Sequence, residues 1–274
     1  MLIVRTLPEL RAACAALGPD IGLAPTMGAL HAGHLALVAA ARAGNEKVAA
    51  SIFVNPRQFG PNEDLARYPR DEAGDLAKLE AAGCDLVWLP DAAVMYPPGD
   101  ATTVTVAGPA ELWEGAERPG HFAGVATVVA KLLGQVRPRR AYFGEKDWQQ
   151  VQVVRRMVAD MLLPVEIVPV PVVREPDGLA LSSRNRFLST AERQAAPALH
   201  AALAGAARAV GGGASVDGAL REAAAEIGLA GMRVDYIALV DAHSLRPLAA
   251  PSRPARIIAA ARLGSVRLLD NVGL

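Results

Sequence analysis

Short apolar runs alternate with amphipathic stretches up to about residue 175, a pattern typical of parallel strands connected by covering helices. The expected strands lie near Ile21–Ala24, Val48–Val54, Asp85–Leu89, Ala141–Phe143 and Glu166–Val173. Between them, each expected helix is long enough to cross over between neighbouring parallel strands. The helices are Leu35–Ala43, Asp71–Ala82, Val125–Gln135 and Trp148–Asp160. The pattern therefore predicts an α/β fold built on a doubly wound parallel sheet.

The pattern changes after Pro176, Asp177 and Gly178, a turn-forming run that follows the last of these strands. Two consecutive helical segments come next, separated by three glycines, and strand-like runs complete the chain. The helical segments are Thr190–Val210 and Val216–Ile227, and the strand-like runs are Asp235–Val240, Arg256–Ala261 and Val266–Leu269. We therefore expect a larger α/β domain at 1–176 and a smaller α+β domain at 177–274.

The composition allows a large core and excludes several classes of protein. Hydrophobic residues make up 52% of the 274 residues and charged residues 20%, which is ordinary for a globular chain and unlike a disordered one. Lys and Arg together number 28, and Asp and Glu also number 28, so no overall field would hold a polyanion. We therefore expect no nucleic acid partner, and any nucleotide must be bound by a local cluster of charge.

The two cysteines, Cys14 and Cys84, are too few for a disulfide framework or a four-ligand zinc site. No basic segment precedes an apolar stretch at the N-terminus, and no apolar run reaches the roughly 18–20 residues of a membrane-spanning helix. These features predict a cytoplasmic protein with reduced thiols and no membrane partner.

One segment suited to anion binding directly follows the first expected strand and opens a helix: Pro25-Thr26-Met27-Gly28-Ala29-Leu30-His31-Ala32-Gly33-His34. Ligands of an open parallel sheet bind at the carboxyl ends of its strands, where a helix N-terminus presents N–H groups to an anion. Gly28 and Gly33 let the backbone approach a phosphate, and His31 and His34 can both donate to phosphate oxygens. This favours a nucleotide site over the alternatives, a glycine-rich turn with two solvated histidines or an incomplete metal pair.

A second polar segment, Ser51-Ile52-Phe53-Val54-Asn55-Pro56-Arg57-Gln58-Phe59-Gly60, also lies at the carboxyl end of an expected strand. The amides of Asn55 and Gln58 both donate and accept hydrogen bonds, as orientation of a hydroxy acid or an amine requires. They are candidate substrate contacts. A loop of ordinary turn residues is the alternative.

Lysine is scarce, with four lysines against 24 arginines, and one of the four, Lys146, lies between an expected strand and an expected helix. Its segment is Tyr142-Phe143-Gly144-Glu145-Lys146-Asp147-Trp148-Gln149-Gln150. A compact ammonium can follow phosphate charge as it moves, and Asp147 can hold Mg²⁺ or a hydroxyl. Gln150, three residues after Asp147, would face the same crevice. A surface Glu-Lys-Asp run is the alternative, because acidic residues are favoured at helix starts.

The fourth segment, Gly178-Leu179-Ala180-Leu181-Ser182-Ser183-Arg184-Asn185, lies at the expected domain boundary. Two hydroxyls and a guanidinium there could close over a triphosphate, and a helix N-cap before Thr190 with a surface ion pair is the alternative. A further turn and helix start contains His121, which can cap or pack the helix and for which we do not expect direct catalysis. His200 and His243 are expected to be structural.

Taken together, these segments closely resemble the pantothenate synthetase (pantoate–β-alanine ligase) family of the His-x-Gly-His nucleotidyltransferase superfamily. The resemblance is carried, in the family's order, by residues 25–34, 51–60, 67–70, 120–124, 144–150 and 181–185, and it weakens toward 263–271. It implies a Rossmann-like N-terminal domain that binds nucleotide and pantoate, a smaller C-terminal lid domain and a homodimer. Trp148 in place of a Phe or Tyr, and Ala29 where Asn or Ala occurs, are minor departures.

The resemblance further implies ATP- and Mg²⁺-dependent condensation of (R)-pantoate with β-alanine to pantothenate, with release of AMP and pyrophosphate through an enzyme-bound pantoyl adenylate. Catalysis would rest on stabilisation of charge at the phosphates by His34, the acid of the family, with His31, Lys146, Ser182, Ser183 and Arg184. No residue stands out as a general base for the amine of β-alanine.

The implied substrate contacts divide into two sets. Gln58 and Gln150 would hold pantoate, Gln58 would also meet β-alanine, and Asn55 joins them as a candidate. The implied ATP contacts are Pro25, Thr26, Met27, Gly28, Ala29, Leu30, His31, Ala32, Gly33, His34, Gly144, Glu145, Lys146, Asp147, Val173, Leu181, Ser182, Ser183 and Arg184. Mg²⁺ would lie on the ATP phosphates, with Asp147 as the nearest candidate carboxylate.

Three other functions fit the sequence less well. A related enzyme that transfers a nucleotide to a phosphorylated acceptor would need further cationic contacts, whereas Gln58 and Gln150 are neutral. A nucleotide-binding module without catalysis would bind ATP without turnover, and the joint presence of Lys146, both histidines and Arg184 counts against it. A dinucleotide dehydrogenase would carry Gly-x-Gly-x-x-Gly after the first expected strand, and that segment lacks the motif.

Overall fold

The computed structural model describes residues 1–61 and 63–274, which form two compact units. The first unit comprises residues 1–145 and 149–171, and the second comprises residues 146–148 and 172–274. The boundary expected near residue 176 thus lies a few residues inside the second unit. Residues 146–148 join the second unit although they lie far from that boundary in sequence.

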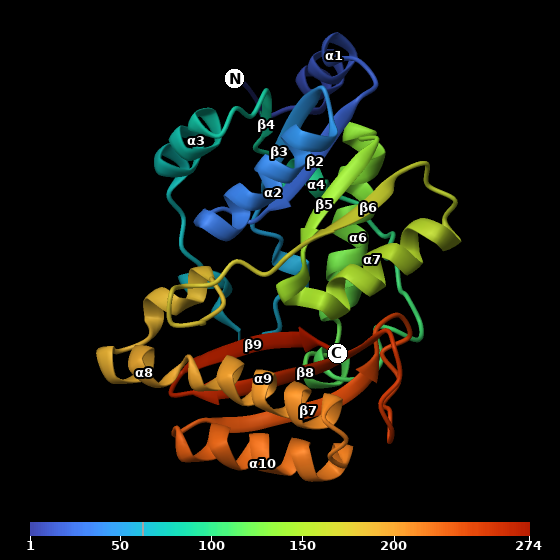
Figure 1. Cartoon of the computed structure of the whole chain (residues 1–274). Coiled ribbons are helices and arrows are strands. Elements are labelled where there is room, and N and C mark those ends of the chain that lie inside the picture. The colour runs from blue at the N-terminus through green and yellow to red at the C-terminus, as the bar shows by residue number, and fades with distance from the viewer. Residues whose placement is uncertain (62) are drawn as a thin grey trace. The chain divides into compact units, whose positions relative to one another are not determined.

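A six-stranded parallel sheet in the order β1-β4-β3-β2-β5-β6 runs through the first unit (Figure 1). β2 lies between β3 and β5, and the strand order runs outward from it in both directions, so the sheet is doubly wound with its switch point at β2. The predicted fold class is confirmed. The strands are β1 (Leu2–Val4), β2 (Ile21–Thr26), β3 (Lys47–Ile52), β4 (Leu86–Trp88), β5 (Arg140–Gly144) and β6 (Glu166–Val170).

The first strand and the first helix were missed, so the strand that begins at Ile21 is the second of the chain. β1 is short and lies at the sheet edge, where Leu2 and Ile3 are about half exposed, so it lacks the pattern of a buried strand. The helix α1 (Leu7–Leu17) does carry a signal, a capping box in which Thr6 and Glu9 satisfy each other's backbone amides.

The two faces of the sheet are covered by different helices because neighbouring residues of a strand point to opposite sides. Leu23 and Leu86 pack in the core with α1, α6 and α7, whereas the next residues along the chain, Ala24 and Val87, pack in the core with α2 and α3. Ten residues of α6 are buried, which makes it an interior helix. The longer helices after α1 are α2 (Ala32–Gly44), α3 (Glu72–Ala81), α6 (His121–Val136) and α7 (Trp148–Asp160).

Short helices occupy the connections. Two are single α-helical turns, α4 (Ala92–Met95) and α5 (Glu114–Glu117). The 3₁₀ turns are η1 (Pro56–Gln58), η2 (Asp64–Arg67), η3 (Glu145–Asp147) and η4 (Ser183–Phe187).

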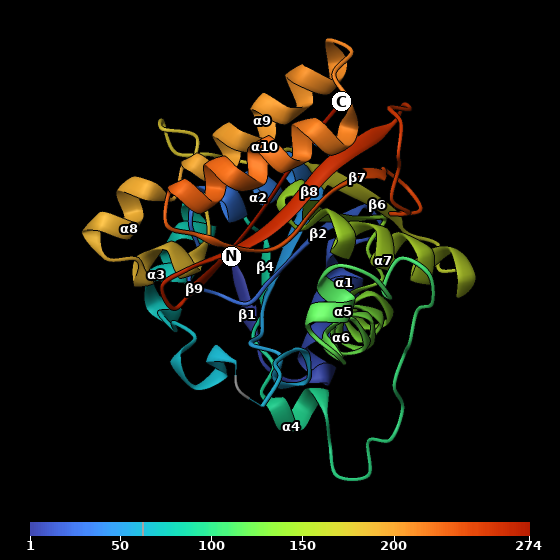
Figure 2. The same cartoon turned by 90° about the horizontal axis from the view of Figure 1, so that it is seen from below.

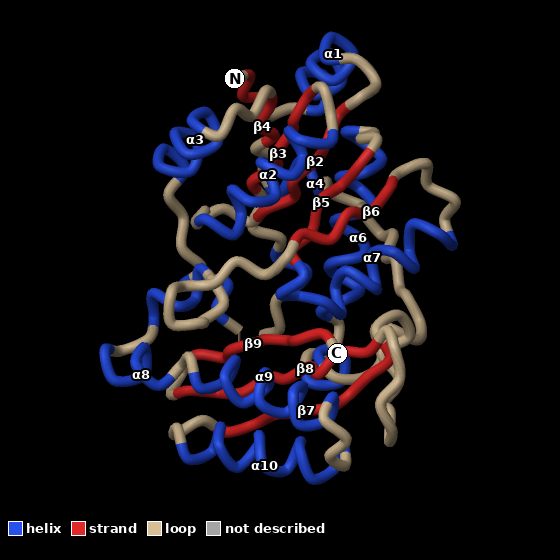
Figure 3. Tube along the Cα trace, in the orientation of Figure 1, coloured by secondary structure: helices blue, strands red, loops and turns tan. Residues whose placement is uncertain are grey.

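The second unit is a three-stranded antiparallel sheet, β7-β8-β9, covered by helices (Figure 3). Its strands are β7 (Arg233–Asp241), β8 (Ala255–Leu263) and β9 (Val266–Gly273). α9 (Ala198–Gly211) and α10 (Val216–Leu229) lie side by side against this sheet (Figure 2). The single helix predicted for Thr190–Val210 was wrong: α8 (Thr190–Ala195) ends before Pro197, which has no N–H for a continuous helix.

Neither cysteine forms a disulfide within the described residues, and burial raises the pKa of the Cys84 thiol to about 11. Such a thiol stays protonated at neutral pH and packs as a small apolar group. In residues 1–61 and 63–274, no helix has both the length and the apolar character needed to cross a membrane.

Candidate active site

Two of the candidate segments leave the sheet at the same level. β2 pairs with β3 in parallel, and the register matches Thr26 with Ile52, the last residues of the two strands. Residues 27–34 and 53–60 therefore both start at the carboxyl edge of the sheet, beside the switch point. This is the edge at which doubly wound sheets bind their ligands.

His31 and His34 form the start of α2, and each imidazole caps part of it. Nδ1 of His31 accepts a hydrogen bond from the Gly33 amide at 3.1 Å, and Nδ1 of His34 accepts one from the His31 amide at 3.3 Å. A neutral imidazole that accepts at Nδ1 carries its proton on Nε2, so both rings have an Nε2–H donor. The ring centroids are 4.1 Å apart, so charging both rings would be unfavourable. The arrangement therefore favours two neutral donors.

The helix start predicted at Leu35 was three residues late, because histidine is not among the residues usually favoured at an N-cap. The same cap that lengthens the helix determines the tautomer of both imidazoles. The pair expected to meet phosphate thus lies in the first turn of α2, where the helix dipole also favours an anion.

The turn before α2 contains Gly28 (φ 81°) and Ala29 (φ 51°), both in the left-handed region. Thr26 begins it: its hydroxyl donates to the carbonyl of Ser51 at 2.7 Å and accepts from the Gly28 amide at 3.2 Å. Leu30 is buried in the core between the sheet and α2. The proposed ATP contacts of this segment that keep exposed surface are Pro25, Met27, His31, Ala32, Gly33 and His34.

Asn55 is buried and holds the side chain of Gln58. Its Nδ2 donates to Oε1 of Gln58 at 3.0 Å and to the carbonyl of Gly124 at 3.1 Å. Its Oδ1 accepts from the Tyr96 hydroxyl at 2.7 Å, and burial raises the pKa of Tyr96 to about 12, which keeps that donor protonated. Gln58 in turn donates from Nε2 to Sδ of Met27 at 3.1 Å, which joins the first two candidate segments.

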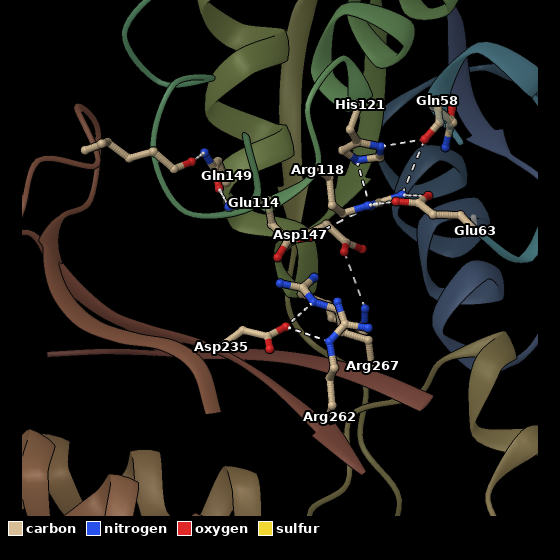
Figure 4. Close-up of polar contacts among 12 residues, drawn as sticks. Gln58, Glu63, Glu114, Arg118, His121, Asp147, Gln149, Asp235, Arg262 and Arg267 are labelled. Atoms are coloured by element: carbon tan, nitrogen blue, oxygen red, sulfur yellow. Dashed lines mark hydrogen bonds and ion pairs between the residues drawn. The ribbon is translucent and has the colours of Figure 1, made fainter. Parts of the chain in front are cut away.

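A second set of side chains holds the backbone of Gln58 (Figure 4). Its carbonyl oxygen lies 2.8 Å from Nδ1 of His121 and 3.3 Å from Nη2 of Arg118, and Nη1 of Arg118 lies 3.2 Å from Nε2 of His121. Arginine has only donors, so His121 accepts at Nε2 and donates from Nδ1 to Gln58. His121 is therefore a neutral residue that positions Gln58.

Glu63 orients Arg118 by accepting two hydrogen bonds, at 2.8 Å from Nε and 2.6 Å from Nη2. Burial alone would raise the pKa of Glu63, but these hydrogen bonds and the charge of Arg118 outweigh it and lower that pKa. The pair consequently stays ionised at neutral pH, with both partners partly buried.

Gly124 allows α6 to approach the Gln58 segment closely. A Cβ atom at this position would collide with the carbonyl group of Arg57 and the amide of Gln58, which are backbone groups that cannot turn aside. The lack of a side chain therefore permits the hydrogen bond from Asn55 to the Gly124 carbonyl.

Gln149 and Gln150 have different surroundings on α7. Gln149 is buried, accepts from the Glu114 amide at 3.0 Å and donates to the carbonyls of Pro109 and Leu112 at 2.8 and 2.7 Å (Figure 4). Gln150 is only partly buried. Successive residues of a helix point in directions about 100° apart, so the two side chains have different neighbours. Gln149 holds the loop before α6 in place, and Gln150 remains the candidate substrate-binding residue.

In the second unit, Nζ of Lys146 lies 3.4 Å from Oδ1 of Asp147, and the Lys146 carbonyl accepts from Nδ2 of Asn271 at 3.1 Å. The Asp147 side chain is 44% exposed. It fits Mg²⁺ carried by ATP, because that ion keeps several waters and binds through one or two carboxylates and substrate phosphates. Residues 1–61 and 63–274 contain no group of three or more His, Cys, Asp or Glu that could hold a metal without substrate.

Val173 and Leu181 close a hairpin that carries the fourth candidate segment. The Leu181 amide donates to the Val173 carbonyl at 3.0 Å. Ser182 then caps η4, with its hydroxyl accepting from the Arg184 amide at 3.3 Å. The cap of α8 before Thr190 is Ser189. Ser182 is therefore a capping residue, but of a different helix from the one considered in the sequence.

Four residues of these networks were missed from the sequence: Glu63, Asp75, Tyr96 and Arg118. Asp75 accepts from the amides of Ala29 and Leu30, and its signal was an acidic residue on the apolar face of a helix. Arg118 precedes His121 by three residues at the start of a buried helix, which was also a usable signal. Tyr96 and Glu63 had no signal in the sequence, because their partners Asn55 and Arg118 lie 41 and 55 residues away.

The sheet is doubly wound, and a helix capped by two histidines begins at its switch point, with the oriented side chain of Gln58 nearby. These features are those of a nucleotide-binding α/β enzyme. The family model described as pantoate-beta-alanine ligase matches residues 2–273. The chain belongs to the pantoate–β-alanine ligase family.

Individual relatives agree over the whole length. The chain is 59% identical to pantothenate synthetase of Acidiphilium cryptum, covering 100% of both, and 57% identical to that of Granulibacter bethesdensis, covering 100% and 97%. The crystal structure of pantothenate synthetase from Thermus thermophilus superposes with a TM-score of 0.96 at 54% identity, covering 99% of both chains. Pantoate-β-alanine ligase from Francisella tularensis, complexed with β-γ ATP and β-alanine, gives 0.85 at 34% identity, covering 100% and 97%.

Proposed function

We propose that the protein condenses (R)-pantoate with β-alanine in an ATP-dependent ligase reaction of pantothenate biosynthesis, releasing AMP and pyrophosphate. The observation that carries this proposal is the family match over residues 2–273. The local geometry supports it, because the two histidines and Gln58 follow adjacent strands at one edge of the sheet.

In the first step, a carboxylate oxygen of pantoate attacks the α-phosphorus of ATP. The bond between that phosphorus and the oxygen bridging to the β-phosphate breaks, and pyrophosphate leaves with the electron pair. Negative charge grows on the phosphates, so donors that are already in place stabilise the transition state more than the ground state. We assign this role to the Nε2–H groups of His31 and His34 and to Lys146, Ser182, Ser183 and Arg184.

Gln58 and Gln150 bind pantoate in this proposal. Neutral amides suit a small hydroxy acid, and Asn55 and Met27 restrict Gln58 to one orientation before the substrate arrives. Asn55 itself acts through Gln58, because the protein already engages both ends of its amide. The other ATP contacts in the proposal are Pro25, Thr26, Met27, Gly28, Ala29, Leu30, Ala32, Gly33, Gly144, Glu145, Asp147, Val173 and Leu181.

In the second step, the free amine of β-alanine attacks the carbonyl carbon of the pantoyl adenylate. AMP leaves with the electron pair of the mixed anhydride, and the new amide loses its extra proton to solvent. Gln58 also contacts β-alanine, and the smaller unit acts as a lid that keeps water from the anhydride. Asp147 would hold Mg²⁺ carried by ATP, and the ion would supply positive charge for the departing pyrophosphate.

Exchange of labelled pyrophosphate into ATP tests the first step without β-alanine. With Mg²⁺ present, the protein is expected to catalyse exchange only when pantoate is added, because reversal of adenylate formation is the route back to ATP. Exchange without pantoate, or ATP binding without any exchange, would contradict the proposed reaction. A screen of other carboxylates then separates a different acid substrate from a module that only binds ATP.

The same assay tests Gln58. Gln58→Ala is expected to raise the KM for pantoate about tenfold and to leave ATP binding within about twofold, the scale of one or two lost hydrogen bonds. Gln194→Ala, an exposed glutamine of α8, is the matched control and should behave as wild type. A larger loss in ATP binding than in use of pantoate would show that Gln58 does not belong to the acid pocket.

We also propose a homodimer, supported by the extended segment 101–107. Thr102, Thr103 and Thr105 are exposed and alternate in part with Val104 and Val106, which pack on the core. Within the part of the chain that the structure describes, residues 101–107 make no backbone–backbone hydrogen bond. Figure 2 shows this segment within the long loop between α4 and α5. Side chains already engage the Val104 amide, which donates to Thr127, and the Thr102 carbonyl, which accepts from Arg57. The β-branched segment has no backbone partner strand, so it is suited to antiparallel pairing with the same segment of a second copy.

Thr105→Pro removes one N–H from that segment and is expected to weaken the dimer at least about tenfold, measured by sedimentation equilibrium. Thr105→Val keeps the N–H and should leave the dissociation constant unchanged. A wild-type protein that sediments as a monomer at micromolar concentration, or equal dimerisation of both variants, would overturn this interface.

A further inference from the structure

Asp75 lies where an apolar residue would be expected. It is on the same face of α3 as Leu79, which is fully buried, and Asp75 itself is only 1% exposed. A buried carboxylate is unfavourable unless hydrogen bonds or a cation compensate it. Within α3, the ammonium of Lys78 lies 3.5 Å from the Asp75 carboxylate. From outside α3, two backbone amides of another segment donate hydrogen bonds to that carboxylate.

Those two amides belong to the turn that leads into α2. Oδ2 of Asp75 accepts from the Ala29 amide at 2.7 Å, and Oδ1 accepts from the Leu30 amide at 2.8 Å. Ala29 is in the left-handed region, which an L-residue with a Cβ rarely adopts unless its surroundings enforce it. One carboxylate thus holds both amides of a strained turn directly before His31.

Gly28 provides the space for this contact. A Cβ atom on Gly28 would lie 3.0 Å from Oδ2 of Asp75 and 3.1 Å from Cγ2 of Ile52, and Gly28 also has a positive φ. The glycine in the motif thus lets the carboxylate reach the turn. In this conformation the amides of Ala29 and Leu30 point to Asp75, so the donors for phosphate come from the first turn of α2 and its imidazoles.

We propose that Asp75 is a positioning residue for the nucleotide site: it sets the turn 28–30 and thereby the placement of His31 and His34. The inference rests on the proposed function, since those histidines are assigned there to ATP. Asp75 acts through the turn rather than by contact with ATP. Loss of its charge should therefore impair use of ATP selectively, while Gln58 keeps its own hydrogen bonds to Asn55 and His121.

Asp75→Asn tests this with little change of volume, since an NH₂ group replaces one acceptor that faces an amide. In pyrophosphate exchange, the KM for ATP is expected to rise at least about tenfold, and the KM for pantoate to change less than about twofold. Amide hydrogen exchange of Ala29 and Leu30 should accelerate relative to the strands. Asp71→Asn is the matched control: it removes a carboxylate that caps the same helix by accepting from the Gly74 amide, and its kinetics should match wild type.

An unchanged KM for ATP in folded Asp75→Asn, or equal rises for ATP and pantoate, would overturn the positioning role. If Asp75→Asn does not fold, Asp75→Glu provides the test. Its longer side chain keeps the charge but moves the acceptor oxygens away from the amides of Ala29 and Leu30. A raised KM for ATP in Asp75→Glu then supports the proposal, and a wild-type KM for ATP refutes it. Failure of the proposed function is seen separately, as wild-type protein without pantoate-dependent exchange. Equilibrium binding of ATP to wild type and Asp75→Asn then still tests the role of Asp75, with at least about tenfold weaker binding expected.

Discussion

His34→Ala and Lys146→Ala are each expected to slow pantoate-dependent pyrophosphate exchange by about 100-fold or more, the usual scale for loss of one donor at a developing charge. His34 presents a neutral Nε2–H at the start of α2, so its loss removes a hydrogen bond together with part of the helix cap. Lys146 supplies a full positive charge whose flexible stem can follow the phosphates. The effect should fall on the rate at saturating substrates, because these interactions strengthen in the transition state.

Matched substitutions separate these losses from general effects of charge or folding. His243→Gln changes an exposed histidine, and Lys47→Ala removes a partly exposed lysine 3.9 Å from Asp85. Both controls should exchange pyrophosphate at the wild-type rate. If His34→Ala or Lys146→Ala also kept that rate, the residue concerned would have no part in adenylate formation.

The fold could be predicted where a regular spacing of apolar residues coincided with burial of those residues. The strands β2 to β6 and the longer helices α2, α3, α6 and α7 follow from apolar runs and amphipathic spacing. The errors have local physical causes. β1 is a short edge strand with little buried surface, and Pro197 divides a helical pattern that otherwise continues.

The motifs of the candidate site could be predicted from the sequence, but the residues that hold those motifs in place could not. Glycines and histidines after a buried strand indicate an anion site because backbone and helix geometry are local. The carboxylate that holds the turn and the residues that orient Gln58 come from distant parts of the chain: Asp75 lies 46 residues from Ala29, and Arg118 lies 60 residues from Gln58. Such pairs depend on strand order and helix packing, which spacing alone does not reveal.

The second large effect is expected on stability: Arg174→Met should lower the free energy of unfolding by about 3–5 kcal/mol, the cost of leaving a buried charge without its partner. Arg174 donates to both carboxylate oxygens of Asp270, at 2.6 and 2.8 Å, and to the Gly178 carbonyl at 3.1 Å. The Asp270 side chain is 3% exposed. Urea unfolding at pH 8 measures the loss. Arg193→Met, which breaks a more exposed pair with Asp177, should cost far less stability, because solvent screens that pair.

His200 makes this loss depend on pH. Its Nδ1 lies 3.7 Å from Asp270, and burial followed by the charge of Arg174 lowers the pKa of His200, so wild type loses stability as pH falls below the ordinary histidine pKa of about 6.5. Without Arg174, the carboxylate of Asp270 acts on His200 with no opposing arginine, so the pKa of His200 is lowered less than in wild type. The imidazolium then forms more easily and replaces part of the lost charge. The gap between variant and wild type should therefore narrow from pH 8 to pH 5.5. A constant gap would show that His200 does not respond to Asp270, and a cost below about 1 kcal/mol at pH 8 would show that water already compensates the carboxylate.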